Sequence, residues 1–237
     1  MDLHQRSVIV FGGSSGIGLE VARAARARGA DVVLAARDEA KLAAAARDIG
    51  GARTVALDVA REEDVEKLFA SLPHVDHVVT TAADLRYQPV ASFDLAAARR
   101  VVDTKLLAAL LLAKHAGPRM RAGGSITFTG GVAAERPSRT GAMVAAVNAG
   151  LGGLCRALAI ELAPIRVNVI APGWVDTPFW DTFAGADKGA RLAATAARLP
   201  VGRVGRSEEI AHAVMFLIEN GFTTGEVLHV DGGHRIV

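Results

Sequence analysis

Cysteine is almost absent from this sequence of 237 residues, in which Cys155 stands alone. A single thiol excludes a disulfide within the chain and a metal site built from cysteines. The seven histidines show no metal-ligand spacing, so we expect no metal ion. Cys155 lies in an apolar stretch, which favours a place in the core over the role of a nucleophile.

Runs of like charge and long hydrophobic runs are also lacking. The 27 lysines and arginines exceed the 25 acidic residues by two, and no basic arm stands apart. Nucleic-acid binding therefore has no electrostatic basis here. The longest uninterrupted apolar stretch, Leu106 to Ala113, is far shorter than a membrane span, and the first residues lack the order of a signal peptide. We expect a soluble, cytoplasmic protein that binds no membrane.

Apolar residues are abundant, at 51% of the chain against 22% charged residues. A chain of this length and composition can bury a large core, which excludes disorder as a description of the whole. No repeat, linker or break in composition divides the sequence. We therefore predict a single domain over residues 1–237.

Short runs rich in Val and Ile alternate with segments of helical period. This alternation predicts a parallel sheet with helices on both faces, because strands covered on both faces are apolar throughout. The predicted strands are Ser7–Phe11, Asp31–Ala35, Thr54–Leu57, His77–Thr80, Ser125–Thr129, Arg166–Ile170 and Glu226–Val230. The predicted helices are Ile17–Ala27, Glu39–Ile49, Glu62–Ala70, Leu95–Ala116, Ala142–Leu162, Lys188–Arg198 and Ser207–Ile218. The irregular insertion Pro178–Arg198 lies where a lid could sit.

A glycine-rich turn over residues 12–18 joins the first predicted strand to the first predicted helix. Its glycines allow a tight turn and a close backbone approach to a pyrophosphate, towards which the helix directs its N-terminal amides. The strand before it and the helix after it favour this interpretation over an ordinary glycine-rich turn. The predicted dinucleotide-binding residues of this turn are Gly12, Ser14, Ser15, Gly16, Ile17 and Gly18.

The end of the second predicted strand indicates which dinucleotide binds. An acidic residue there favours NAD, whereas an arginine favours the 2′-phosphate of NADP(H), and the strand runs on into Ala36 and Arg37. The alternative is that Arg37 is a solvated surface residue. Asp58, after the third strand, can accept from the adenine amino group or cap the helix that begins near Arg61.

Short motifs continue to the end of the chain. They are Leu57-Asp58-Val59, Glu161-Leu162-Ala163, Arg166-Val167-Asn168, Pro172-Gly173, Thr177-Pro178, Thr224-Gly225 and Asp231-Gly232-Gly233. With the glycine-rich turn, they make the whole chain resemble the short-chain dehydrogenase/reductase family. The resemblance implies one α/β domain with a Rossmann-type, doubly wound parallel sheet of about seven strands. It also implies hydride transfer between a nicotinamide and a carbonyl or alcohol, and homodimers or homotetramers built through the two long central helices.

The resemblance extends the predicted cofactor site beyond the glycine-rich turn. It implies that Pro172, Gly173 and Thr177 flank the nicotinamide. The remaining predicted cofactor-binding residues are Val59, Thr81, Ala82, Ala83, Asn148 and Val175.

The positions of the family's proton relay carry other residues here. Val144 stands in the place of the family's tyrosine, Asn148 of its lysine, Gly131 of its serine and Lys105 of its asparagine. Val144 cannot exchange a proton and Gly131 has no side chain to donate from, while Asn148 can hydrogen-bond a ribose but carries no charge. The usual relay is therefore absent, and catalysis would need a relocated proton donor.

Two residues are candidates for that donor, Lys105 first and Tyr87 second. Lys105 lies in an otherwise apolar helix, where burial would lower its pKa and let it act as an acid near neutral pH. The alternative is a lysine that reaches solvent or pairs with Asp103. Tyr87 is the only tyrosine and follows the fourth strand, at the edge where such sheets bind ligands. Its alternative is packing in a loop.

The sequence thus favours an atypical NADP(H)-dependent oxidoreductase acting on a small carbonyl compound or alcohol. The aromatic residues Trp174, Phe179 and Trp180 can line an apolar substrate pocket, or can simply anchor their loop. The alternative function is that of a non-catalytic NADP(H)-binding sensor or regulatory protein, which needs the phosphate site but no acid–base groups.

Overall fold

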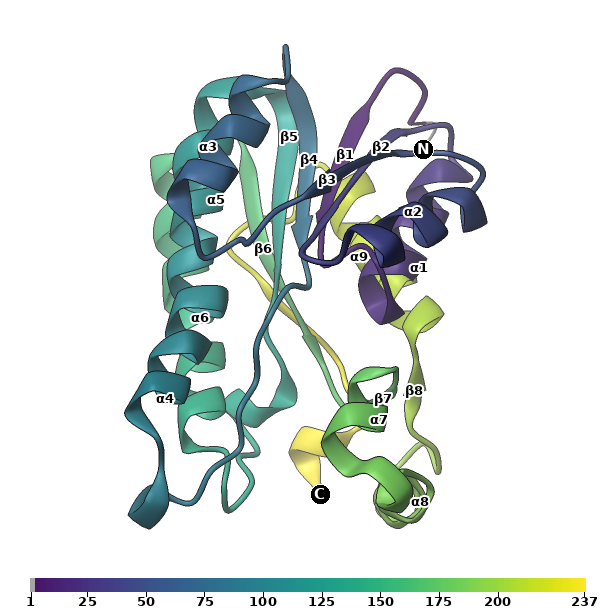
Figure 1. The fold of residues 1–237 in the computed structure, drawn as a ribbon, viewed down its shortest axis with the longest axis vertical. Helices are drawn as coiled ribbons and strands as arrows, with labels where there is room; N and C mark the ends of the chain where they lie inside the picture. The colour runs from purple at the N-terminus through teal and green to yellow at the C-terminus, as the bar shows by residue number, and fades with distance from the viewer. Residues whose placement is uncertain (1–2) are drawn as a thin grey trace.

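The computed structural model describes residues 3–237, the side chain of Thr182 excepted. Seven parallel strands form one sheet in the order β3-β2-β1-β4-β5-β6-β9 (Figure 1). Their bounds are β1 Ser7–Phe11, β2 Asp31–Ala36, β3 Arg53–Ala56, β4 Val75–Thr80, β5 Met120–Thr129, β6 Arg166–Pro172 and β9 Val227–Val230. The strand order reverses direction between β1 and β4, which confirms the doubly wound α/β fold.

Helices cover both faces of the sheet, as Figure 1 shows. One face carries α1 Gly16–Arg26, α2 Glu39–Asp48 and α9 Ser207–Glu219. The other carries α3 Glu62–Ala70, α4 Leu95–Val102, α5 Ala108–Ala116 and α6 Ala142–Glu161. Each layer has its own apolar core, since a strand such as β1 turns Ile9 and Phe11 to one core and Val8 and Val10 to the other. Burial on both faces explains why these strands are apolar throughout.

The single helix predicted over Leu95–Ala116 is interrupted in the structure. A π-helical turn, η2 Asp103–Leu107, separates α4 from α5. The Asp94 carboxylate starts α4 by accepting from the backbone N–H groups of Ala96 and Ala97 at 3.0 and 3.2 Å. The sequence pattern did not reveal the wider turn, because the chain stays helical through it and the apolar residues that follow it hide a shift of one residue.

The region after β6 contains the predicted helix, α8 Lys188–Ala196, and three elements that the sequence did not predict. Short strands β7 Val175–Asp176 and β8 Gly205–Arg206 pair with each other, and α7 Phe179–Ala184 precedes α8 between them. Figure 1 shows this part below the carboxyl ends of the main strands. Short 3-10 turns also occur, among them η4 Val132–Ala134 after β5 and η6 His234–Ile236 near the C-terminus.

Helix α6 is long and apolar enough to cross a membrane by length and composition alone. In this fold it lies on β6 and turns Leu151, Cys155 and Leu158 into the core. Buried Cys155 donates from its thiol to the Val167 carbonyl oxygen at 3.2 Å, and burial raises the pKa of the thiol to about 12. The cysteine is therefore an inert core residue, as its apolar surroundings predicted.

Candidate active site

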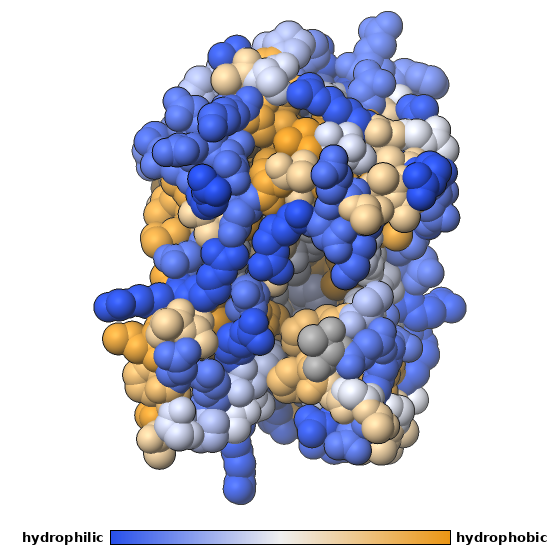
Figure 2. Space-filling view, viewed as in Figure 1, coloured by the Kyte–Doolittle hydropathy of each residue, from blue (hydrophilic) through white to orange (hydrophobic). Residues whose placement is uncertain are grey.

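A cavity of about 680 Å³ opens at the carboxyl ends of the strands. In Figure 2 the surface is hollowed near the centre of the view, above apolar side chains of the α7 region. The volume lies within the range usual for ligand pockets, and a doubly wound sheet binds ligands at this edge. All of the predicted site residues line the cavity except Gly18, with Lys105 and Tyr87 among them.

The glycine-rich turn between β1 and α1 has backbone geometry that suits only glycine. Gly12 and Gly16 have φ angles of 79° and 53°, which side chains disfavour. A Cβ on Gly12 would lie 2.6 Å from Thr81 Oγ1, and one on Gly18 would lie 2.2 Å from the Gly12 carbonyl oxygen. Gly18 is thus needed for the close packing of helix against turn, while the turn itself leaves open the space that a pyrophosphate would occupy.

The far end of the cavity holds the residues predicted to meet the adenosine. Arg37 is exposed there. Asp58 accepts from the Ala60 N–H at 3.0 Å and from Arg100 Nη2 at 2.7 Å. Burial raises the pKa of Asp58, but the Ala60 N–H, Arg100 and Arg37 together lower it further, so the carboxylate is ionised. Asp58 therefore closes a turn before α3, and does not accept from the first N–H groups of the helix itself.

Three of the four changed relay positions, Gly131, Val144 and Asn148, lie together on one wall of the cavity. Val144 is 1% exposed and offers no proton. Asn148 donates from Nδ2 to the Gly131 carbonyl oxygen at 3.4 Å. Its Oδ1 is buried and has no hydrogen-bond partner among the described residues. An unpaired buried acceptor suits a ligand hydroxyl, so the site fits the ribose of a nicotinamide cofactor.

Lys105 lies in the π-helical turn η2 and faces the same cavity. Its side chain is buried, and Nζ donates to the Gly130 carbonyl oxygen at 3.2 Å. Within residues 3–237 no carboxylate lies within ion-pair distance of Nζ, so the ammonium neither pairs with Asp103 nor reaches solvent. Burial lowers the pKa of Lys105 to about 8.

Tyr87 packs among the aromatic residues of the α7 region. Its ring lies 5.0 Å from that of Phe183, and burial raises the pKa of its phenol above the ordinary value. The backbone of this loop is tied to the segment after β5, because Gln88 donates from its N–H to the Thr140 carbonyl oxygen at 2.8 Å. Tyr87 therefore packs on a neighbouring ring and also lines the cavity, so its position agrees both with packing in the loop and with a role as proton donor.

The aromatic residues after β6 both anchor their loop and line the cavity. Trp174 and Trp180 stack with ring centroids 4.2 Å apart, and Trp180 Nε1 donates to the Val175 carbonyl oxygen at 2.8 Å. Phe179 stacks on Phe183 at 5.5 Å. Because these rings also border the cavity, they give one end of it an apolar wall, which we call the aromatic wall.

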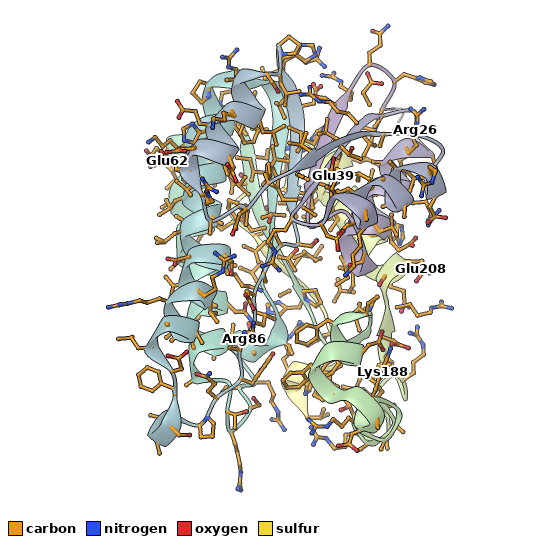
Figure 3. The ribbon with its side chains drawn as sticks, in the orientation of Figure 1. Arg26, Glu39, Glu62, Arg86, Lys188 and Glu208 are labelled. Atoms are coloured by element: carbon orange, nitrogen blue, oxygen red, sulfur yellow. The ribbon has the colours of Figure 1, made fainter. Side chains whose placement is uncertain are left out.

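Ion pairs brace the segments on both sides of the cavity. Figure 3 shows Arg86 on the segment after β4 and Lys188 at the start of α8. Arg86 pairs with Asp84 at 3.0 Å, while Lys188 pairs at 2.8 Å with both Asp176 of β7 and Asp181 of α7. These contacts fix the loops that carry the aromatic wall.

Five basic residues that sequence reasoning did not identify line the cavity. They are Lys41, Arg100, Arg136, Arg191 and His234. His234 directly follows the Asp231-Gly232-Gly233 motif, which was the one signal that pointed towards it. The arginines come from α4, from the segment after η4 and from α8, and no local pattern marks any of them.

Known proteins resemble this chain over nearly its full length. A family model described as enoyl-(acyl carrier protein) reductase matches residues 12–235. A short-chain dehydrogenase/reductase, ucsE of Acremonium sp, is 36% identical over 258 residues that cover 99% of this chain and 97% of that protein. The cis-4-hydroxycyclohexanecarboxylate dehydrogenase of Sinomonas cyclohexanicum is 36% identical, with 98% of both chains covered. A solved small-chain dehydrogenase in complex with NADPH is 34% identical, with a TM-score of 0.87 and coverage of 98% and 99%.

Proposed function

This chain belongs to the short-chain dehydrogenase/reductase family, and we propose that it is an atypical NADP(H)-dependent member whose proton donor is Lys105. The observation that carries the proposal is the buried Lys105 ammonium on the cavity wall, with no carboxylate beside it among the described residues. The NADPH complex of one relative and the dehydrogenase name of another support nicotinamide-dependent oxidation and reduction as its chemistry.

Different residues of the cavity would bind different parts of the cofactor. The N–H groups of the glycine-rich turn would hold the pyrophosphate, and Arg37 would form charge-assisted hydrogen bonds with the 2′-phosphate. Asn148 Oδ1 would accept from a ribose hydroxyl and so gain the partner that it lacks. The bound cofactor supplies or accepts the hydride; the chain supplies the proton and orients both reactants.

Lys105 suits the proton transfer better than Tyr87. A pKa of about 8 keeps the ammonium protonated at neutral pH and yet close enough to that pH for efficient donation. In a buried site the positive charge also stabilises the negative charge that develops on a carbonyl oxygen. The raised pKa of Tyr87 makes its phenol a weaker acid. The substrate is a small carbonyl compound or the corresponding alcohol, packed against the aromatic wall.

Removing the ammonium tests this assignment directly. We expect Lys105→Met to lower kcat for NADPH-dependent reduction of a carbonyl by about 10²–10⁴-fold, the usual contribution of a positioned acid. Tyr87→Phe is the matched comparison, because it removes one hydroxyl from the same cavity and should leave most of the turnover. Affinity for NADPH, measured by its fluorescence, should change little in either variant.

Two results would contradict the assignment. Loss of turnover in Tyr87→Phe with normal turnover in Lys105→Met would make the tyrosine the acid. If the starting protein binds NADPH but oxidises it with no member of a broad carbonyl panel, the sensor or regulatory function replaces the enzymatic one. The three changed relay positions Gly131, Val144 and Asn148 are the observation that favours this second function.

We also propose that the protein assembles as a homodimer or homotetramer through α5 and α6. Apolar side chains on and next to these helices are turned to solvent, since Ile160 of α6 is 81% exposed, Leu110 of α5 43% and Leu107, at the end of η2, 44%. Apolar side chains exposed on neighbouring helices favour an interface between copies of the chain. Light scattering at micromolar concentration tests the proposal, and a monomer would contradict it.

A further inference from the structure

Positive charge is distributed unevenly along the cavity. Three carboxylates and six lysines or arginines line it, although the whole chain has a net charge of only +2. The three carboxylates all lie near cations: Asp38 is 3.9 Å from Lys41, while Asp58 and Asp84 are 2.7 and 3.8 Å from Arg100. This is the adenosine end. Of the four cations left over by these pairings, Arg37 lies at this same end, and the other three, Lys105, Arg136 and Arg191, stand elsewhere along the wall.

The opposite end of the cavity, which we call the aromatic end, holds those cations. It is bordered by Lys105, Arg136, Arg191 and His234 beside the aromatic wall. Arg191 lies over the Phe183 ring, 5.9 Å from its centroid, and its nearest carboxylate, Asp187 at 4.0 Å, is not part of the cavity lining. An end with this charge attracts anions and excludes cations.

Arg136 is the side chain best placed to bind an anion there. Its backbone N–H donates to the Val132 carbonyl oxygen at 2.8 Å, which fixes the residue just after η4. The neighbouring Glu135 contacts His229, whose Nε2 lies 2.7 Å from Glu135 Oε1. No carboxylate within residues 3–237 forms an ion pair with Arg136. A planar guanidinium without a protein partner matches the two oxygens of a carboxylate.

His234 supplies the second, independent observation. It is 6% exposed, and its Nδ1 is buried without a hydrogen-bond partner among the described residues. Asp231 holds it in place by accepting from the N–H groups of Gly233 and Arg235, both at 3.0 Å. Burial first, and then the charges of Arg198 and Arg136, lower the pKa of His234, so its ring is neutral at pH 7. A neutral imidazole with an uncommitted nitrogen can donate one N–H to a ligand.

We propose that the aromatic end is a carboxylate-binding subsite, in which Arg136 and His234 hold the carboxylate of a ring-containing carbonyl substrate or of the corresponding alcohol. The ring would pack against Trp174 and Phe179, which border the same end. The carbonyl part of this assignment rests on the proposed reductase function, whereas the binding of the carboxylate does not. The subsite therefore predicts an anionic substrate where the proposed function alone predicts only a small carbonyl compound.

A matched pair of probes tests the subsite by binding. 4-Acetylbenzoate and its methyl ester share a ring and a ketone and differ in the carboxylate charge. We expect the acid to bind the NADP⁺-loaded protein at least 10-fold more tightly than the ester, as measured by calorimetry. Arg136→Gln should remove that preference, and His234→Gln should reduce it several-fold. Arg139→Gln is the control, since this exposed arginine lies on the same segment but does not line the cavity.

The outcomes separate the subsite from the proposed function. Equal binding of acid and ester, binding of neither at millimolar concentration, or a preference that survives Arg136→Gln would overturn the subsite. Because Arg136 is exposed, that variant is expected to fold even if His234→Gln does not. Preferential, Arg136-dependent binding of the acid without NADPH oxidation would support the subsite and count against the reductase. Equal reduction of acid and ester that Arg136→Gln leaves unchanged would support the reductase function and count against the subsite.

Discussion

The Asp76 network at the amino edge of the sheet and the cavity wall at its carboxyl edge treat their buried polar groups in opposite ways. At the amino edge, Asp76 is 1% exposed and accepts from the Ser7 N–H at 2.8 Å, from Arg6 at 2.9 Å and from Arg121 Nε at 2.8 Å. His77 Nδ1 lies 2.9 Å from Ser125 Oγ. At the carboxyl edge, one buried atom of Asn148 and one of His234 lack partners among the described residues.

This difference distinguishes polar groups that stabilise the fold from those available to a ligand. A satisfied network rigidifies its surroundings, whereas an unsatisfied buried group costs free energy that a ligand can recover on binding. The His77 ring is neutral because burial lowers its pKa to about 4, yet it does not line the cavity at the carboxyl ends of the strands. A shifted pKa alone therefore does not mark a functional site; the cavity beside Lys105 does.

The largest expected effect on stability lies at the amino edge. Asp76→Asn removes the charge that two arginines share, and we expect the free energy of unfolding to fall by about 3 kcal/mol, below the upper range for broken buried pairs because both arginines are partly exposed. Urea unfolding measures this change. The control Asp31→Asn alters an exposed carboxylate on β2, two strands away in the sheet. If Asp76→Asn weakened NADPH binding without lowering stability, the division between the two edges would be wrong.

A smaller effect, with a definite sign, is expected at Lys105. Its pKa is about 8 in the folded chain and 10.5 in the unfolded chain, so the unfolded chain binds more protons between these values. The stability contributed through this group is present above pH 10.5 and is lost as the pH falls through 8. Lys105→Met should therefore gain about 2–3 kcal/mol of stability over the starting protein on going from pH 10.5 to pH 7. A difference independent of pH would show that the ammonium is not buried.

The smallest of these effects concerns the choice of cofactor. Arg37 lies exposed at the adenosine end, where Arg37→Ala should weaken NADPH binding by about 10-fold and leave NADH binding nearly unchanged. Titration with both cofactors measures the preference. Equal affinity of the starting protein for NADPH and NADH would refute the assignment of Arg37 to the 2′-phosphate.

Local patterns sufficed to predict the sheet and the glycine-rich turn, and the resemblance to the family added much of the cavity lining. The run Ser7–Phe11 and the glycines after it are recognisable from near neighbours in the sequence, even though distant residues such as Thr81 pack against the turn. The changed relay positions Gly131 and Val144 were identified by their spacing from the family motifs, and both line the cavity.

The rest of the site depends on tertiary convergence. Arg136, Arg191 and His234 lie far apart in the sequence, and only the packing of α8 and the C-terminal turn brings them to one cavity. Strands β7 and β8 have two residues each, too few to show alternation. Lys105 is buried within the π-helical turn, which the apolar pattern of Leu95–Ala116 did not reveal.

The pH dependence of kcat/KM for carbonyl reduction tests the central claim most directly, because it reports the protonation state of the essential acid. If Lys105 is that acid, kcat/KM falls as the pH rises through about 8, and Tyr87→Phe keeps this decline. Lys105→Met should leave a low activity whose kcat/KM shows no decline near pH 8. A decline near pH 8 that persists in Lys105→Met and disappears in Tyr87→Phe would contradict the account.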